Sequence, residues 1–154
     1  MPDYRIRPAT PSDAPIVADH RVKMFSEMGE LLARDVPTVQ AASEARAAED
    51  LASGAYLAWF VEYEHEIVAG AGMLLHDYYP NAKNPLGLPT AYVLNVYTEP
   101  SHRHVGLARR LVLEIFGWCT AHGVSRVSLH ASPAGRSIYE KLGFQSTNEM
   151  RVDL

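Results

Sequence analysis

The chain has 154 residues and a formal net charge of −4 at pH 7, and a chain of this length can bury a core as one domain over residues 1–154. The mild negative charge disfavours a nucleic-acid partner, which usually needs a basic face, and no apolar stretch is long enough to cross a membrane. The single cysteine, Cys119, excludes an internal disulfide and fits a reducing, cytoplasmic location.

The first part of the chain predicts a short strand followed by two helices. Residues 4–7 alternate between polar and apolar side chains, as a strand does. Residues 10–13, Thr-Pro-Ser-Asp, carry the start signals of a helix, with the threonine as N-cap, and that helix runs to about residue 28. A second, alanine-rich helix is expected over residues 38–53, ending at a glycine.

The middle of the chain predicts a strand hairpin, a long loop and a buried strand. Residues 56–63 and 67–75 are two β-rich runs joined by a tight connection, which is the pattern of a hairpin. Residues 77–89 are aromatic, proline-rich and without a period, so they form a loop over the surface. The apolar run at 91–97 is short, β-branched and aromatic, and it therefore predicts a buried strand.

A strand–helix junction at residues 103–109 is the most informative stretch of the chain. It contains Arg-x-x-Gly-x-Ala, and apolar residues follow at helical spacing, at positions 108, 111, 112, 115 and 119. A helix that begins on small residues presents free backbone N–H groups and the positive end of its dipole. Gly106 and Ala108 allow a ligand to approach the backbone closely, so the junction predicts a site for an anion, and for phosphate above all.

A second motif lies at residues 132–144, after a further β-rich run at 126–131. It reads Ser-x-x-Gly-x-x-x-Tyr-x-x-x-Gly-Phe, and it predicts a helix that carries Tyr139 and ends at Gly143. Taken on its own, Tyr139 is either a functional group or a tyrosine packed on the sheet. The tail from 144 to 154 has room for two short strands around Asn148.

The two motifs together resemble the signature of the GNAT superfamily of N-acetyltransferases. That family carries Arg/Gln-x-x-Gly-x-Gly/Ala between its fourth strand and third helix, and Asn-x-x-Ala-x-x-x-Tyr-x-x-x-Gly-Phe later in the chain. Tyr139, Gly143 and Phe144 keep the family spacing, while Ser132 and Gly135 replace the usual Asn and Ala. The resemblance implies an α/β fold (α+β, mixed sheet), the GNAT acyl-CoA N-acyltransferase fold. Its central, mostly antiparallel sheet is splayed between strands 4 and 5 and has helices on both faces.

The resemblance also implies that acetyl-CoA is the cosubstrate and that no metal takes part. In this family the pantetheine arm lies between the splayed strands and hydrogen-bonds to the fourth strand, and the diphosphate sits on the amides of the junction. Carried onto this sequence, the cofactor-binding residues are Val96, Thr98, Arg103, His104, Val105, Gly106, Leu107, Ala108, Arg109 and Ser132. Arg103 is either a phosphate contact or a solvated arginine.

The chemistry that the resemblance implies is direct transfer of an acetyl group from a thioester to an amine. Tyr139 is the catalytic candidate, as the general acid that protonates the departing sulfur or as a hydrogen-bond donor to it. The amine must lose a proton, because an alkylamine is mostly protonated at pH 7. Many family members use a glutamate on the fourth strand for this step. That position falls near Tyr92, which is not a carboxylate, so a base relayed by water is favoured. The side chains that stay open as alternative bases are those of Glu99, His76, Asp77 and His130.

The resemblance implies an acceptor site built from the first two helices, the loop after the third strand and the C-terminal strands, and Asn95 on the fourth strand can also face the acceptor. The substrate-binding candidates are Arg21, Asp77, Tyr78 and Asn95. Arg21 interrupts a mostly apolar helix face, so it either binds a substrate carboxylate or pairs with a nearby acid. Asp77 can hold a cationic amine, and Tyr78 offers a flat amphipathic wall beside it.

The activity that the sequence supports best is acetyl transfer from acetyl-CoA to the primary amine of a small molecule, such as an amino acid, a polyamine or an aminoglycoside. Two alternatives stay open: a protein lysine or N-terminal acetyltransferase, and a non-catalytic module that senses acyl-CoA. Residues 150–154 alternate as an exposed strand edge does, so we also expect a homodimer.

Overall fold

The centre of the molecule is a sheet with the mixed pairing that the sequence predicted. The computed structural model describes residues 3–154 and shows five strands in the order β1-β2-β3-β4-β5. Their bounds are Arg5–Pro8 for β1, Tyr56–Tyr63 for β2, Glu66–His76 for β3, Thr90–Thr98 for β4 and Val127–Leu129 for β5. Neighbours pair antiparallel from β1 to β4, whereas β4 and β5 run parallel. The predicted α/β fold with a mixed sheet is therefore confirmed.

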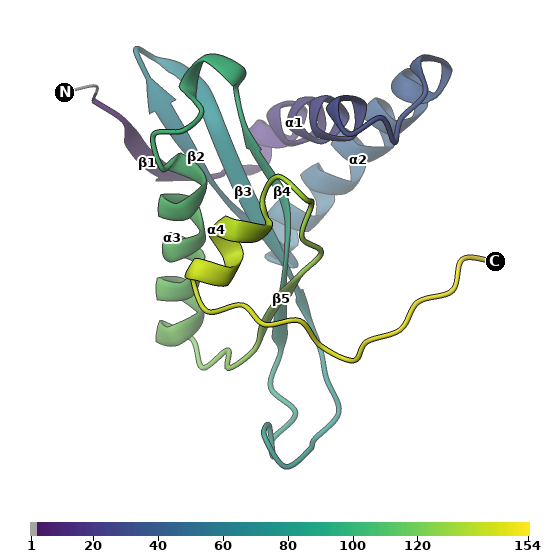
Figure 1. Cartoon of the computed structure of the whole chain (residues 1–154), viewed down its shortest axis with the longest axis vertical. Helices are drawn as coiled ribbons and strands as arrows, with labels where there is room; N and C mark the ends of the chain where they lie inside the picture. The colour runs from purple at the N-terminus through teal and green to yellow at the C-terminus, as the bar shows by residue number, and fades with distance from the viewer. Residues whose placement is uncertain (1–2) are drawn as a thin grey trace.

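Helices cover both faces of this sheet. Their bounds are Ala14–Glu27 for α1, Val36–Ser53 for α2, Leu107–Ala121 for α3 and Arg136–Lys141 for α4. Figure 1 shows α1 and α2 on one side of the sheet and α3 and α4 on the other. Within residues 3–154, no helix combines the length and the apolar character that crossing a membrane requires.

Each face of the sheet has its own hydrophobic core. The core under α3 consists of Trp59, Val61, Val68, Ala69, Ala71, Met73, Ala91, Val93, Leu107, Leu111, Ile115 and Cys119. The core under α1 and α2 consists of Ala14, Val17, Ala47, Tyr56, Ala58 and Phe60. Strand β2 contributes to both, because successive side chains of a strand point to opposite faces.

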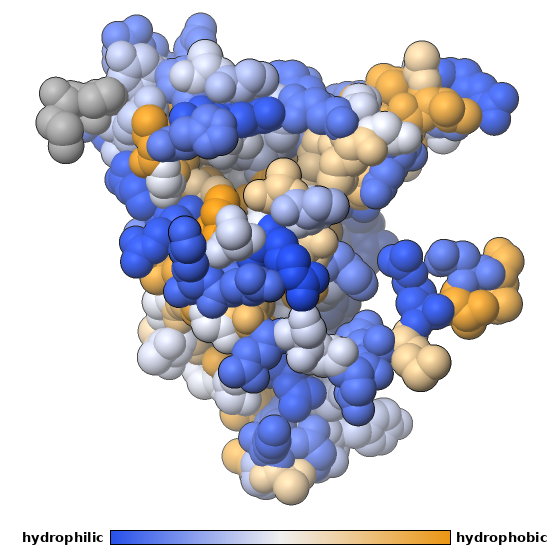
Figure 2. Space-filling view, in the orientation of Figure 1, coloured by the Kyte–Doolittle hydropathy of each residue, from blue (hydrophilic) through white to orange (hydrophobic). Residues whose placement is uncertain are grey.

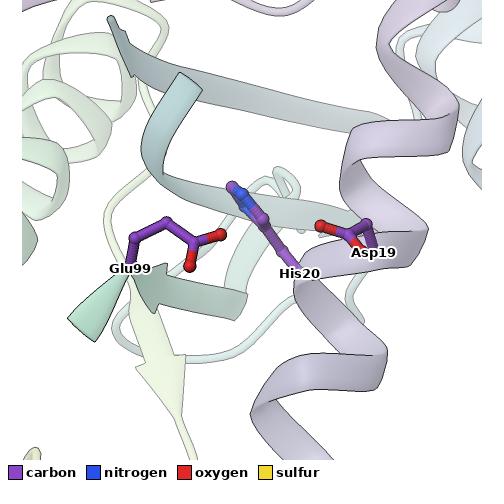
Figure 3. A group of neighbouring side chains, drawn as sticks. All are labelled: Asp19, His20 and Glu99. Atoms are coloured by element: carbon purple, nitrogen blue, oxygen red, sulfur yellow. The ribbon is translucent and has the colours of Figure 1, made fainter. Parts of the chain in front are cut away.

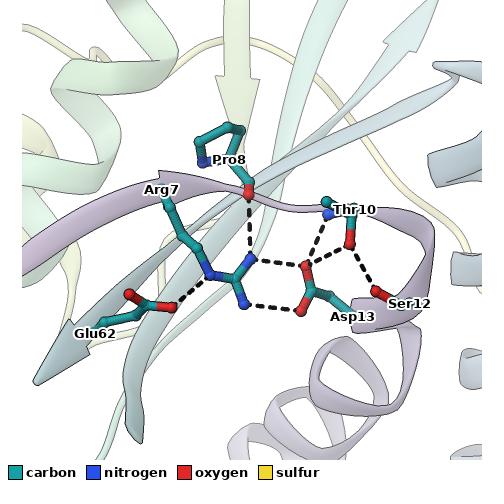
Figure 4. Close-up of polar contacts among 6 residues, drawn as sticks. All are labelled: Arg7, Pro8, Thr10, Ser12, Asp13 and Glu62. Carbon is teal, nitrogen blue, oxygen red and sulfur yellow. Dashed lines mark hydrogen bonds and ion pairs between the residues drawn. The ribbon is translucent and has the colours of Figure 1, made fainter. Parts of the chain in front are cut away.

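A network of ion pairs ties β1 to β2 and to the start of α1 (Figure 4). Arg7 donates two hydrogen bonds to the carboxylate of Asp13, at 2.8 and 2.9 Å, and one to Glu62 at 2.7 Å. Asp13 also accepts the amide of Thr10 at 2.7 Å, so the helix start read from the sequence is present. The hydrogen bonds from Arg7 hold the pKa of the Asp13 carboxyl below its ordinary value, which keeps the pair charged in mildly acidic solution.

Two glycines on β3 make room for aromatic rings of β2. A Cβ atom at Gly72 would lie 2.1 Å from the hydroxyl oxygen of Tyr56, and one at Gly70 would lie 2.7 Å from the ring of Phe60. Both rings are buried in the core under α1 and α2. The sequence pattern of a strand does not show which glycine lies under a neighbouring ring, so this packing could be found only in the structure.

The C-terminal tail does not form the two strands expected around Asn148, and that prediction is wrong. Residues 145–154 are exposed and have no regular secondary structure. Figure 1 shows the tail running away from the rest of the chain. A strand needs a partner for its backbone hydrogen bonds, and the tail makes none with the backbone of residues 3–144.

We expect Gly72→Ala to destabilise the protein by about 1–3 kcal/mol, because the added methyl group overlaps the buried phenol of Tyr56. Gly117→Ala is the matched control. Gly117 lies in α3, a Cβ there would meet no atom within 4 Å, and alanine should add about 0.5–1 kcal/mol through helix propensity. Urea unfolding measures both effects. A Gly72→Ala variant as stable as the wild type would contradict the packing of Tyr56 over β3.

Candidate functional site

Strands β4 and β5 separate after a short stretch of pairing. Residues 91–93 pair with residues 127–129, and within residues 3–154 no further pair joins the two strands. Strand β4 continues to Thr98, so residues 94–98 present one edge without a strand partner. The splay between strands 4 and 5 that was expected from the sequence is therefore present.

A β-bulge in β4 lies at the point of separation. Gly70 and Gly72 of β3 stand opposite Tyr97 and Leu94, so β4 holds one more residue than β3 between these pairs. Asn95 takes the left-handed conformation, with φ of 57°, which asparagine tolerates better than most residues. The bulge turns Leu94 and Asn95 to the same face of the sheet, toward the core under α1 and α2.

A cleft of about 400 Å³ opens where β4 and β5 part. Its walls come from α1 and the segment after it, from β4, from the end of β5 and the segment that follows it, from α4 and from the C-terminal tail. Its lining residues are Arg21, Met24, Phe25, Met28, Glu30, Tyr92, Val93, Leu94, Asn95, Val96, Leu129, His130, Ala131, Ser132, Tyr139 and Arg151. In Figure 2 the surface is hollowed on the right, between α1 and α2 above and the tail below.

The cleft brings together five residues that the sequence singled out at distant positions. These are Arg21, Asn95, Val96, Ser132 and Tyr139. The guanidinium of Arg21 donates a hydrogen bond to Oδ1 of Asn95 at 2.8 Å. The first helix, the fourth strand and the second motif therefore contribute to one site.

Sequence reasoning counted His130 among several possible bases without selecting it, and the structure places it in the cleft. Its Nδ1 forms a hydrogen bond with the hydroxyl of Tyr92, and both side chains line the cleft. Burial raises the pKa of Tyr92, so the phenol is protonated at neutral pH. The signal that links these two residues is the parallel register of β4 and β5, which the sequence does not reveal.

The junction before α3 offers a run of unpaired backbone amides. No backbone N–H of residues 104–109 donates to a protein acceptor within residues 3–154, and no side chain caps the helix. His104 and Gly106 have φ of 65° and 83°, and alternating left-handed residues of this kind form concave anion-binding nests. The N-terminus of α3 adds the positive end of its dipole. This backbone therefore meets the demands of a phosphate group.

Arg103, at the start of the junction, braces two elements against each other. Its Nε donates to the carbonyl of Thr98 at 2.8 Å, and its Nη2 donates to Glu27 of α1 at 2.7 Å. Its guanidinium also lies 5.6 Å from the centre of the Tyr97 ring. Arg103 thus ties the end of β4 to the end of α1, a role that neither sequence interpretation of this residue included.

Packing of its ring fixes Tyr139 at the edge of the cleft. The ring is 9% exposed and meets Phe144 edge to face, with 5.8 Å between centroids. A Cβ atom at Gly135 would lie 3.0 Å from this ring, so the glycine in place of the family's alanine gives the tyrosine room. Ser132, in place of asparagine, accepts the amide of Gly135 at 3.1 Å. Burial raises the pKa of Tyr139, which keeps its hydroxyl protonated and able to donate.

Asp77 and Tyr78 do not line this cleft. Tyr78 borders a separate hollow of about 200 Å³ beside the loop between β3 and β4. The guanidinium of Arg126 lies 5.7 Å from the centre of its ring. Asp77 is exposed at the start of the same loop. The structure therefore does not bring these two candidates together with Arg21 and Asn95, and their contact with the acceptor stays a prediction.

Another group of titratable side chains, Asp19, His20 and Glu99, lies between α1 and the end of β4 (Figure 3). Their ligand atoms lie within 4.8 Å of one another, which is close enough to share a metal ion. The ammonium of Lys23 already bonds both carboxylates, at 2.9 Å to Asp19 and 2.6 Å to Glu99. The position of a cation in this group is therefore taken by the chain itself.

Comparison with protein families gives a match over most of the chain. A model of the acetyltransferase (GNAT) family matches residues 25–144. The matched segment contains β4, the junction before α3 and Tyr139. Both sequence motifs therefore lie inside it.

Solved structures and a curated protein resemble the chain as well. A GCN5-related N-acetyltransferase from Ralstonia eutropha JMP134 is 29% identical, with 99% of each chain covered and a TM-score of 0.91. A protein from Clostridium acetobutylicum, described as a predicted acetyltransferase with acetyl-CoA, is 26% identical, with 99% of this chain and 96% of that chain covered and a TM-score of 0.89. The glucosamine 6-phosphate N-acetyltransferase of Trypanosoma brucei brucei is 28% identical over 89 residues. That match spans 57% of this chain and 58% of the curated protein, somewhat more than half of each.

The buried imidazole of His20 should make stability depend on pH. Burial lowers the pKa of His20 from 6.5 to about 4. The charges of Asp19 and Glu99 partly oppose this shift, and the charge of Lys23 adds to it. Between these pH values the unfolded chain binds one more proton than the native chain, so the free energy of unfolding falls as the pH drops from 6.5 to 4. The full loss is about 3 kcal/mol.

Urea unfolding across this pH range measures the effect. We expect a shallower pH dependence for His20→Phe, which removes the titrating group. His65→Asn, in the exposed turn between β2 and β3, should keep the wild-type slope. Equal slopes for the three proteins would mean that His20 is not held neutral by the fold.

Proposed function

The chain belongs to the acetyltransferase (GNAT) family, and we propose on that basis that it transfers the acetyl group of acetyl-CoA to the primary amine of a small molecule. The observation that carries the proposal is the run of unpaired amides at residues 104–109, next to the open edge of β4. Acetyltransferases of this family use acetyl-CoA, and one solved relative is described with it. The curated relative acts, by its name, on a small amine, glucosamine 6-phosphate.

The residues proposed for the cosubstrate follow the backbone. The amides of residues 104–109 receive the diphosphate, with Arg109 adding positive charge at its edge. The open edge of β4 offers the backbone of Val96 and Thr98 to the pantetheine arm, and Ser132 stands on the wall of the cleft contributed by the second motif. The thioester supplies the activated acetyl group, and its acceptor reaches it in the cleft.

Tyr139 is the catalytic residue of this proposal. The neutral acceptor nitrogen forms a bond to the acetyl carbon and the C–S bond breaks. The sulfur leaves with a proton from Tyr139, and the proton that the nitrogen loses as the amide forms returns to the tyrosine. Tyr139 lines the cleft, and no hydrogen bond within residues 3–154 engages its hydroxyl, so the hydroxyl is free to donate to that sulfur. Burial raises its pKa, so the phenol carries its proton at neutral pH.

The acceptor must also lose a proton before it attacks. His130 and Glu30 both line the cleft, and imidazole and carboxylate groups are the usual general bases of enzymes. His130 is fixed by its hydrogen bond to Tyr92, at the position where many family members carry a glutamate. We propose His130, directly or through water, as the acceptor of this proton. We place the reaction in the cytoplasm, where the free thiol of Cys119 stays reduced.

The direct test is release of free thiol from acetyl-CoA in the presence of a panel of amines. The panel contains amino acids, polyamines, amino sugars, aminoglycosides and peptides with a free N-terminus or lysine. Release with a small amine supports the proposal. Release with peptides alone would replace it by protein acetylation. If acetyl-CoA binds but no amine causes thiol release, the proposed enzyme is instead a non-catalytic sensor.

We expect Gly106→Glu to weaken acetyl-CoA binding about 10-fold or more, because the variant sets bulk and negative charge against the diphosphate. Gly106 has φ of 83°, so the matched control is Gly123→Glu, at φ of 74° in the turn after α3. The control carries the same charge change and the same backbone strain. Calorimetry should show wild-type affinity for the control. Equal affinity in the two variants would move the cosubstrate site away from the junction.

We expect Tyr139→Phe to lower turnover about 10²- to 10⁴-fold, which is the usual contribution of a general acid. The hydroxyl matters only as the C–S bond breaks, so acetyl-CoA binding should change little. Steady-state kinetics and calorimetry separate the two effects. Unchanged turnover, under conditions where acetyl transfer limits the rate, would make Tyr139 a packing residue.

We also propose that the chain is a homodimer held through its C-terminal tails. The tail exposes apolar side chains at alternate positions, with Met150 at 93% and Val152 at 76% exposure. Strand β5 pairs with β4 alone, so its other edge is open within residues 3–154. A second copy can supply the strand partner that each tail lacks.

Light scattering at micromolar concentration should therefore give twice the mass of one chain. Truncation after Thr147 removes the apolar positions of the tail and should give a folded monomer. A monomer mass for the full chain would reject the dimer.

A further inference from the structure

Arg21 differs from the other half-buried arginines in its partner. Three arginines within residues 3–154 are half-buried: Arg7, Arg21 and Arg103. Arg7 pairs with two carboxylates and Arg103 with one. Arg21 has no carboxylate oxygen within 4.0 Å among the described residues. Holding a guanidinium partly out of water without a counter-charge costs free energy, so this charge needs a partner that the chain does not supply.

The partner of Arg21 is a neutral amide held by a neutral phenol. A guanidinium only donates, so Oδ1 of Asn95 faces Arg21 at 2.8 Å and its Nδ2 faces the hydroxyl of Tyr56 at 3.1 Å. Asn95 is 7% exposed and Tyr56 is 4% exposed. Burial raises the pKa of Tyr56 to about 12, so the phenol is uncharged. This relay fixes the guanidinium in place without neutralising its charge.

The rest of the guanidinium is available to a ligand. Arg21 lines the cleft and lies 4.8 Å from the centre of the Phe25 ring, which supports one of its faces. It has five N–H groups, and Asn95 takes only one of its nitrogens. Glu30, the carboxylate that lines the same cleft, stays beyond 4.0 Å. Arg151 of the tail also lines the cleft, but it lies 3.8 Å from the carboxylate of Asp153.

We propose that Arg21, positioned by Asn95, binds an anionic group of the acceptor, so that the substrate is a small amine that also carries a carboxylate or a phosphate. The proposal rests on the proposed function and names the class of its acceptor. The planar fork of an arginine matches both groups with two parallel hydrogen bonds. Arg21 lines the same cleft as Tyr139, so one molecule can present its anion to Arg21 and its amine to the thioester.

The experiment compares pairs of amines in which one member carries an anionic group that the other lacks. Glucosamine 6-phosphate is set against glucosamine, and an α-amino acid against its carboxamide. For the wild type, kcat/KM should favour the anionic member of at least one pair. Preference within the glucosamine pair indicates a phosphate site, and preference within the amino-acid pair indicates a carboxylate site. Arg21→Gln should lower that ratio about 10- to 100-fold, as expected when a hydrogen-bonded charge is lost. Arg34→Gln, an exposed arginine outside the cleft, should keep the wild-type ratio.

Asn95→Asp separates binding from structure. An aspartate has the same shape, can accept from Arg21 and from Tyr56, and supplies the counter-charge that the native chain withholds. We expect this variant to fold and to lose the preference for anionic amines. A wild type that does not distinguish the members of either pair, or an Asn95→Asp variant that keeps the preference, would overturn the proposal.

Calorimetry distinguishes failure of this proposal from failure of the proposed function. The probes are the anionic amines themselves, titrated into wild type and Arg21→Gln in the presence of coenzyme A. Binding that Arg21→Gln loses supports the anion site even if no acetyl group is transferred. Equal binding to both proteins rejects the site even if amines are acetylated.

Discussion

The structure depends on one interruption of its sheet. Strand β4 leaves β5 after residue 93, and two residues later Asn95 adds an extra residue to β4. A continuous ladder would occupy the backbone groups of residues 94–98 and close the space between the strands. The interruption leaves those groups free, and the bulge turns a polar side chain toward α1 at the same point. Gly72 permits this position of Asn95, because the missing side chain leaves room for the phenol of Tyr56, which bonds Asn95.

Charged side chains fix α1, which forms one wall of the cleft. The first turn of α1 is tied to β1 and β2 through Asp13 and Arg7, and its last turn is tied to the junction through Glu27 and Arg103. Between them, Lys23 bonds Glu99 at the end of β4. The pairs that Asp13 and Glu99 make are partly buried, so they hold the helix more firmly than the more exposed Arg103–Glu27 pair does. A wall that is fixed at both ends can present cleft residues such as Arg21 in one place.

The two motifs predicted the fold and part of the site, and the confirmed family membership shows why. Their constraints are local: Gly106 needs a left-handed backbone, and the ring of Tyr139 needs the small Gly135 beside it. The cleft itself depends on contacts between distant segments. Sequence spacing does not reveal that His130 meets Tyr92, or that Arg103 turns to Glu27. The tail is long enough for two short strands, but a segment of sufficient length without a partner in the same chain does not make a sheet.

Amide hydrogen exchange with and without coenzyme A tests the central claim most directly. The claim is that the free amides of residues 104–109 and the open edge of β4 form one binding surface. Coenzyme A should slow exchange in residues 104–109 and in residues 94–98 together, and leave the loop at residues 77–89 unchanged. Unaltered exchange in both segments, at a concentration that saturates binding, would contradict the account, as would protection confined to that loop.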